Sequence, residues 1–164
     1  MNRADLLDLF DYTEFAWQQL MAVTDDNEVL LRPAENSGWP TLRDCLGHIV
    51  RAYSRWAPAI IERKTGFMPE IADSDFRTWA ALNEEHASAR HRLRQSIQTW
   101  NEDELTKLND VEVYGETMRY SRSELILHVL LHERGHHGDA TTLFWQLGIE
   151  ADAALEYRFH LGRG

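Results

Sequence analysis

Residues 128–139 read His-Val-Leu-Leu-His-Glu-Arg-Gly-His-His-Gly-Asp, and the rest of the chain is best understood from this stretch. Three of its histidines, His128, His132 and His136, follow one another at steps of four. Residues four apart lie on one face of a helix, with Cβ atoms about 5–6 Å apart. Two such imidazoles can both reach one metal ion placed about 2.0–2.1 Å from each nitrogen. The stretch therefore predicts a helix that offers two metal ligands and needs a third from another element.

The best candidate for the third ligand is His48. It belongs to a second helical pattern, which begins at Thr41, and it lies in a row of residues that points toward a core. Taken alone, His48 is more simply interpreted as a hydrogen-bonded core histidine. The pair His132 and His136 changes this interpretation. Three histidines that all point into one core are unusual unless they share a ligand. We therefore predict a metal site formed by His48, His132 and His136.

Composition excludes several classes of protein. The chain has 164 residues, of which 43% are apolar, and this suits a single domain over residues 1–164. A net charge of −10 argues against a nonspecific nucleic-acid binder and against binding to anionic membranes. The N-terminus lacks the apolar core of a signal peptide, and no stretch approaches the roughly 18 apolar residues of a membrane span. We therefore expect a cytoplasmic protein. Cys45 is the single cysteine, which excludes an internal disulfide.

Hydrophobic periodicity predicts four long helices, over residues 3–24, 41–64, 74–100 and 121–147. Thr41 is the predicted N-cap of the second helix, and Pro58 is expected to kink that helix or to end its regular part. Asp73 or Ser74 is the predicted cap of the third helix. In the last helix the predicted inward row contains both candidate ligands, and its members are Leu125, Val129, His132, His136, Ala140, Leu143 and Leu147.

Shorter elements complete the predicted fold. Alternating β-formers on both sides of Gly115-Glu116 predict a hairpin within residues 111–120. Ser121 and Glu124 supply capping signals for the last helix. Gly148 is predicted to end this helix by adopting the left-handed backbone conformation. Residues 151–159 have the pattern of a short helix. These elements indicate an all-α four-helix bundle with a short β-hairpin between the third and fourth helices.

The third helix carries a polar run in the middle of its apolar stripe. The residues are Asn83, His86 and Arg90. One interpretation is that these residues lie at the boundary of the core, where one edge of the helix is exposed to solvent. The other is a polar pocket inside the bundle, where these three side chains could bind the polar parts of a cosubstrate.

Other kinds of chemistry fit the same residues less well. The sequence from His132 to His136 matches H-E-x-x-H, in which the glutamate is the general base of a zinc protease. Asp139 and Thr142 stand where the extended protease motif needs glycine and histidine. In a bundle, Glu133 is turned by about 100° from His132 and is expected to face solvent. A di-iron carboxylate site needs further inward glutamates that are not evident.

Cys45 offers a further alternative, because it lies three residues before His48 and on the same helical face. This spacing would suit a nucleophilic cysteine. A small buried apolar filler is the commoner role of such a cysteine.

Several motifs taken together resemble the DinB-like family. They are Ser37-Gly-Trp-Pro-Thr41 followed by His48, the Gly115-Glu116 hairpin before Tyr120-Ser121, and the histidine series that begins at His128. The resemblance spans about residues 5–148 and implies a metal-binding four-helix bundle in up-down-down-up order, often as a homodimer. The metal ligands of that family match His48, His132 and His136. The family often has glutamine where this chain has Asp139.

The resemblance also implies a function, because the wider superfamily includes bacillithiol and mycothiol transferases. Three neutral imidazoles leave one coordination position open, which is typical of catalytic rather than structural zinc sites. We expect Zn²⁺, or alternatively Ni²⁺, since both suit imidazole ligands. The first hypothesis is a metal-dependent thiol S-transferase that uses a low-molecular-weight thiol and a small electrophile. A metal-dependent hydrolase or isomerase and a non-catalytic metal-binding stress-response bundle stay open as alternatives.

Overall fold

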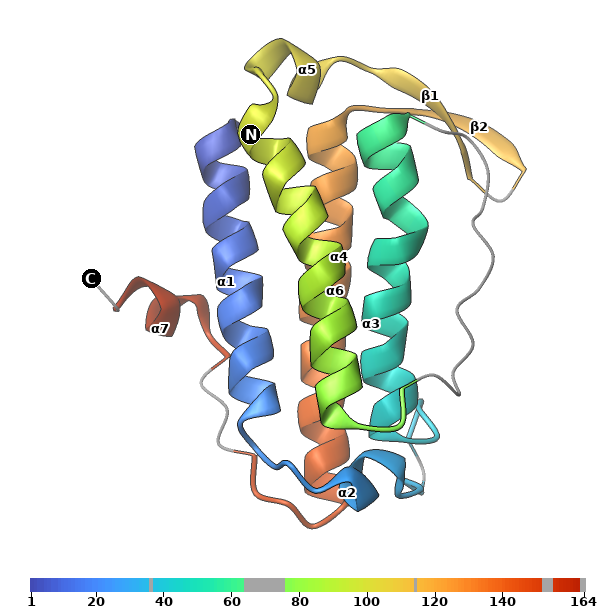
Figure 1. Cartoon of the computed structure of the whole chain (residues 1–164), viewed down its shortest axis with the longest axis vertical. Helices are drawn as coiled ribbons and strands as arrows, with labels where there is room; N and C mark the ends of the chain where they lie inside the picture. The colour runs from blue at the N-terminus through green and yellow to red at the C-terminus, as the bar shows by residue number, and fades with distance from the viewer. Residues whose placement is uncertain (36, 64–75, 114, 152–154, 163–164) are drawn as a thin grey trace.

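The structure is a computed structural model that describes residues 1–35, 37–63, 76–113, 115–151 and 155–162. Four long helices form a bundle: α1 Arg3–Met21, α3 Leu42–Ala57, α4 Trp79–Thr99 and α6 Arg122–Gln146. In Figure 1, α1 and α6 run in one direction and α3 and α4 in the other, which is the up-down-down-up order. The predicted all-α bundle with a short hairpin is confirmed. Within the described part of the chain, no helix is both long and apolar enough to cross a membrane.

Local side-chain chemistry sets where the long helices begin. The Thr41 hydroxyl accepts a hydrogen bond from the backbone N–H of Asp44 and starts α3, as predicted. Ser121 and Glu124 form a reciprocal capping box at the start of α6, also as predicted. The third long helix, α4, begins later than expected because Thr78 supplies its N-cap bond. The alternative caps at 73 and 74 lie outside the described residues.

Proline and glycine mark where regular helix ends. The second predicted helix continues past Ala57 only as a π-helical turn, η1 Pro58–Glu62, because proline has no N–H to donate to the preceding turn. The last long helix ends before Gly148, whose φ of 73° is the left-handed conformation that glycine adopts without strain. The first helix ends at Met21, three residues before the predicted end at 24.

The remaining elements are short. The strands β1 Asn109–Val113 and β2 Glu116–Tyr120 pair antiparallel across a turn in which Gly115 has a φ of 82°. Figure 1 shows this hairpin beyond one end of the bundle, next to α5 Glu102–Thr106. At the other end lies α2 Asn27–Leu31, inside a segment predicted as a plain connection. The C-terminal helix α7 is Tyr157–Leu161, later than the predicted 151–159, of which residues 152–154 lie outside the described residues.

The buried face of α6 differs from the predicted one by about one residue. His132 and His136 were predicted to lie on this face, but they are only half-buried, whereas Glu133 and His137 are fully buried. The physical reason is that α6 packs against both α1 and α3, so the centre of its buried face lies between these neighbours. The two histidines consequently lie at the edge of the core, beside α3. The fully buried row is Ile126, Leu130, Glu133, His137, Ala140 and Phe144.

Candidate metal centre

Three imidazoles from two helices converge between α3 and α6. His48 Nε2 lies 3.0 Å from His132 Nε2, and His136 Nε2 lies 3.2 Å from the same atom. The ring centroids of the three residues are 4.4 to 4.9 Å apart. One ligand atom from each residue lies within 4.8 Å of the others, so the group could hold a metal ion. The structure thus brings together the three histidines predicted as ligands.

Asp139 determines which nitrogen of His136 faces the other two rings. Its Oδ2 atom lies 2.8 Å from His136 Nδ1 and also accepts a hydrogen bond from Trp39 Nε1 at 3.1 Å. A carboxylate beside Nδ1 favours the tautomer that carries the proton there, which leaves the Nε2 lone pair directed toward the other two imidazoles. Metal-binding histidines usually have such a partner on the second ring nitrogen.

Partial burial favours the neutral form of two of the converging rings, His48 and His132. Burial lowers the pKa of His48 to about 4, and the charges of Arg51 and Arg55 lower it further in the same direction. Burial and the neighbouring histidines likewise lower the pKa of His132 to about 4. Neutral imidazole is the form that ligates metal ions.

The donor set fits a divalent ion. Ligand nitrogens about 2.05 Å from a tetrahedral ion are about 3.3 Å apart, close to the two Nε2–Nε2 distances found here. Lone pairs that converge at this separation repel one another unless a proton or a cation lies between them. His128 is farther away, because its ring centroid is 6.3 Å from that of His132. The candidate site, named here the three-histidine centre, therefore consists of His48, His132 and His136, and His128 lies outside it.

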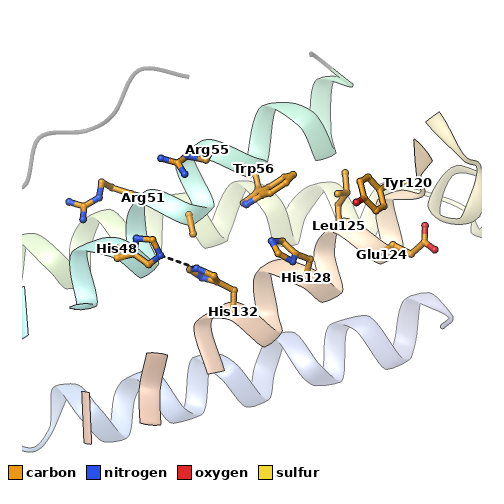
Figure 2. Close-up of a pocket in the computed structure, with 10 residues that line it drawn as sticks. His48, Arg51, Arg55, Trp56, Tyr120, Glu124, Leu125, His128 and His132 are labelled. Atoms are coloured by element: carbon orange, nitrogen blue, oxygen red, sulfur yellow. Dashed lines mark hydrogen bonds between the residues drawn. The ribbon is translucent and has the colours of Figure 1, made fainter. Parts of the chain in front are cut away.

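A cavity of about 420 Å³ opens beside His48 and His132. Figure 2 shows the two histidines pointing toward each other at one end, with Trp56, His128, Leu125 and Tyr120 farther along. This volume lies within the range of small-molecule sites, which is about 300–1,000 Å³. Because His48 and His132 line this cavity, a ligand in it could reach the group of three histidines.

A second cluster, the buried polar layer, crosses the bundle next to the centre. Glu133 is fully buried, and its Oε2 atom lies 2.5 Å from Arg90 Nη1. Its Oε1 atom lies 2.9 Å from His86 Nε2 and 3.4 Å from His137 Nε2. The Tyr53 hydroxyl also donates to Glu133. Burial by itself would raise the pKa of Glu133, but Arg90 and His86 outweigh it and hold that pKa well below its usual value.

This layer corrects the expectation that Glu133 faces solvent. The side chain lies on the buried face of α6, and its carboxylate is held by side chains of α3 and α4. A zinc protease needs the corresponding glutamate beside a metal-bound water, where it acts as general base. Because Glu133 is engaged in the core instead, its position argues against that class.

The polar run of α4 belongs to the same layer. His86 stacks on Trp17, with ring centroids 3.7 Å apart, and Asn83 Oδ1 accepts a hydrogen bond from Trp17 Nε1 at 2.9 Å. Arg90 donates to Thr13 Oγ1 at 3.0 Å. This arrangement matches the predicted polar interior rather than a wetted edge. None of the three α4 residues is among the described residues that line the cavity, so cosubstrate binding by them stays a prediction.

Cys45 is unsuited to the nucleophilic role considered for it. Its side chain is fully buried, and its Sγ atom lies 3.6 Å from the carbonyl oxygen of His136. Burial raises the pKa of this thiol strongly, and the charges of Asp139 and Asp44 raise it further. A protonated thiol is neither a good nucleophile nor a good metal ligand. Cys45 therefore serves as a small core residue.

Three features near the centre were not predicted from the sequence. They are the Trp39–Asp139–His136 chain, the two arginines of the cavity wall, and the salt bridge between Glu133 and Arg90. Arg51 and Arg55 could have been found, since they follow His48 at three and seven residues and so lie near its helical face. The salt bridge joins residues 43 apart in the chain, and neither residue alone signals it.

Comparison with known protein families agrees with this geometry. A sequence model of the DinB family matches residues 7–161, which include every residue of the three-histidine centre and of the buried polar layer. Among curated proteins, none matches the chain significantly. The family match therefore agrees with the resemblance carried by the sequence motifs.

Proposed function

Because the chain belongs to the DinB family, we propose that it is a metal-dependent thiol S-transferase that joins a low-molecular-weight thiol to a small electrophile. The observation that carries the proposal is the three-histidine centre at the end of a cavity of about 420 Å³. A purely structural zinc site is usually closed by four protein ligands, whereas a catalytic site keeps one position for an external ligand.

In this proposal the histidines, Asp139 and the cavity wall have separate roles. His48, His132 and His136 would hold the ion, and Asp139 would keep the His136 ring in its orientation. A bound Zn²⁺ or Ni²⁺ ion would lower the pKa of a coordinated thiol, so that the thiolate forms near neutral pH. The cavity wall, including Trp56 and Leu125, would hold the electrophilic carbon near the sulfur and exclude water.

Cobalt substitution tests the proposal directly. With Co²⁺ in place of the native ion, addition of mercaptoethanol should produce a sulfur-to-metal charge-transfer band, because the thiolate occupies the open position. The band should be absent in His48→Ala, which lacks one ligand, and present in His91→Ala, since His91 is exposed on α4 away from the centre. A cobalt spectrum that no small thiol alters would contradict the transferase and favour a non-catalytic metal-binding role.

A further inference from the structure

The wall of the cavity beyond the three-histidine centre is largely aromatic, and three elements contribute to it. Trp56 comes from α3, His128 from α6 and Tyr120 from the end of β2. Figure 2 shows Trp56 and His128 next to each other, with Tyr120 and Leu125 on the side away from His132. The first side chains that a ligand meets beyond the centre are therefore two aromatic rings.

The rings of Trp56 and His128 meet at an angle of 72°, with centroids 5.0 Å apart. His128 is exposed and Trp56 is half-buried, so both keep surface that a ligand in the cavity can contact. Aromatic rings attract one another in offset-stacked or edge-to-face arrangements by more than the burial of their area. An aromatic ring that packs on Trp56 can adopt one of these arrangements, whereas a saturated ring gains only from the burial of its area.

His128 also places a polar group in this aromatic region. Its ring centroid lies 6.3 Å from that of His132, so it is next to the centre without belonging to it. Among the described residues, none forms a hydrogen bond with its ring nitrogens. An imidazole carries at least one N–H in either of its charge states. An oxygen atom of a ligand can therefore accept a hydrogen bond from His128 whether or not the ring is charged.

Apart from the histidines, the ionisable side chains of the described wall already have partners. They are Glu124, Tyr120, Arg51 and Arg55. Glu124 accepts hydrogen bonds from the backbone N–H and the hydroxyl of Ser121. The Tyr120 hydroxyl donates to Met118 Sδ at 3.1 Å. His128 is thus well placed to bind an oxygen atom of a ligand in this part of the cavity.

From this arrangement we propose that the cavity takes a small molecule in which an aromatic ring bears a carbonyl group. The ring packs on Trp56, and the carbonyl oxygen accepts a hydrogen bond from His128. These two residues then determine which electrophiles are bound, and a molecule held in this way lies beside the centre. The inference deepens the proposed function and rests on it only for the reaction that follows binding.

Three probes of similar shape give the test. Acetophenone has both the aromatic ring and the carbonyl group, cyclohexyl methyl ketone has a saturated ring, and cumene has an apolar branch in place of the carbonyl. Dissociation constants are measured by ligand-detected NMR with zinc-equilibrated protein. The ratio of two dissociation constants is compared between wild type and variant, so that differences in the hydration of the probes cancel.

Variants of Trp56 test the contact with the ring. The dissociation constant of cyclohexyl methyl ketone divided by that of acetophenone should fall about twofold to tenfold in Trp56→Leu, which is the scale of one aromatic pair. Trp56→Phe should retain part of the preference because it keeps an aromatic face. Trp145→Leu is the matched control, since Trp145 is 60% exposed on α6 and is not among the described residues that line the cavity.

Variants of His128 test the hydrogen bond. The dissociation constant of cumene divided by that of acetophenone should fall about twofold to tenfold in His128→Leu, the scale of one hydrogen bond. His128→Gln should retain part of the preference, because its amide keeps an N–H donor. His91→Leu is the control, since His91 is exposed on α4. Metal content and circular dichroism are measured in each variant to show that the centre and the fold are intact.

Each outcome has a distinct meaning. Both contacts are needed, so an unchanged ratio in either leucine variant, or no binding of acetophenone to the wild type, overturns the inference. If the ratios change as expected but no small thiol alters the cobalt spectrum, the inference survives and the transferase fails. If a thiol gives the charge-transfer band but the ratios do not change, the transferase survives and the inference fails.

Discussion

The histidines of the three-histidine centre differ in the neighbouring side chains that hold their rings in place. The His136 ring is held by Asp139 through Nδ1, and Asp139 is held in turn by Trp39. His48 comes from a different helix and contributes the nitrogen that closes the group, 3.0 Å from His132 Nε2. If each histidine supplies one nitrogen to a bound ion, loss of any one would leave two ligands, which would bind a divalent ion much less tightly.

His48→Ala should therefore reduce bound divalent metal nearly as much as His132→Ala, although His48 is 84 residues distant in sequence. The measurement is elemental analysis of purified protein after equilibration with a limiting free Zn²⁺ concentration. His128→Ala and His91→Ala are the controls and should keep close to wild-type stoichiometry. Full stoichiometry in His48→Ala would mean that the third ligand has been wrongly identified.

At the scale of the element, α6 presents two different polar faces offset by one residue. His132 and His136 face α3 at the edge of the bundle, whereas Glu133 and His137 face the core. The buried salt bridge with Arg90 ties the second face to α4. A buried charge that loses its partner is strongly destabilising, so this bridge contributes to the stability of the α6–α4 contact.

Arg90→Met should lower the free energy of unfolding by about 3–5 kcal/mol, because it leaves the Glu133 carboxylate buried without its main cation. Arg94→Met, one turn later on α4, should cost about 1 kcal/mol or less, since exposed pairs contribute little. Arg94 pairs with Asp11 at the surface, where the two side chains are 35% and 44% exposed. Urea unfolding followed by circular dichroism measures both. Equal losses of unfolding free energy in the two variants would show that the buried salt bridge contributes no more to stability than the exposed pair.

Two helical glycines provide a second test at this scale. Gly138 lies inside α6 with no atom within 4 Å of an added Cβ, so Gly138→Ala should stabilise the protein by up to about 1 kcal/mol. An added Cβ at Gly47 in α3 would lie 3.0 Å from Phe76 Cδ2, so Gly47→Ala should gain nothing or lose stability. Thermal melts compare the two directly. A rise in Tm for Gly47→Ala would mean that Phe76 shifts without cost.

In the whole molecule, the centre joins the two halves of the chain. His48 lies on α3 before the hairpin and the other two predicted ligands lie on α6 after it, so a bound ion would link two neighbouring helices of the bundle (Figure 1). A ligand that binds only the folded state stabilises that state according to its free concentration and affinity.

Zinc should consequently raise the melting temperature. At a free concentration about 100 times Kd the gain is about 2.7 kcal/mol, which for a chain of this size corresponds to roughly 5–11 °C. Differential scanning calorimetry with and without zinc gives the shift, and His48→Ala should lose most of it while His91→Ala keeps it. An equal shift in His48→Ala would place the stabilising ion elsewhere.

The sequence by itself determined the element types, most helix starts and the metal-ligand candidates. These depend on local chemistry: the Thr41 and Ser121 caps, the glycine at 148 and the four-residue steps of the histidines. Each signal lies within one or two helical turns, so it can be found without knowledge of the fold. The resemblance to the DinB-like family depended on the same short motifs.

Only the tertiary structure determined the rotation of α6 about its own axis and the interactions of Glu133. Periodicity placed His132 and His136 on the buried face, yet packing against both α1 and α3 centres that face on Glu133 and His137. An offset of one residue, about 100° of rotation, is too small for an apolar pattern to resolve when the helix also carries polar residues inward. The partners of Glu133 come from α3 and α4, and only the folded chain brings them together.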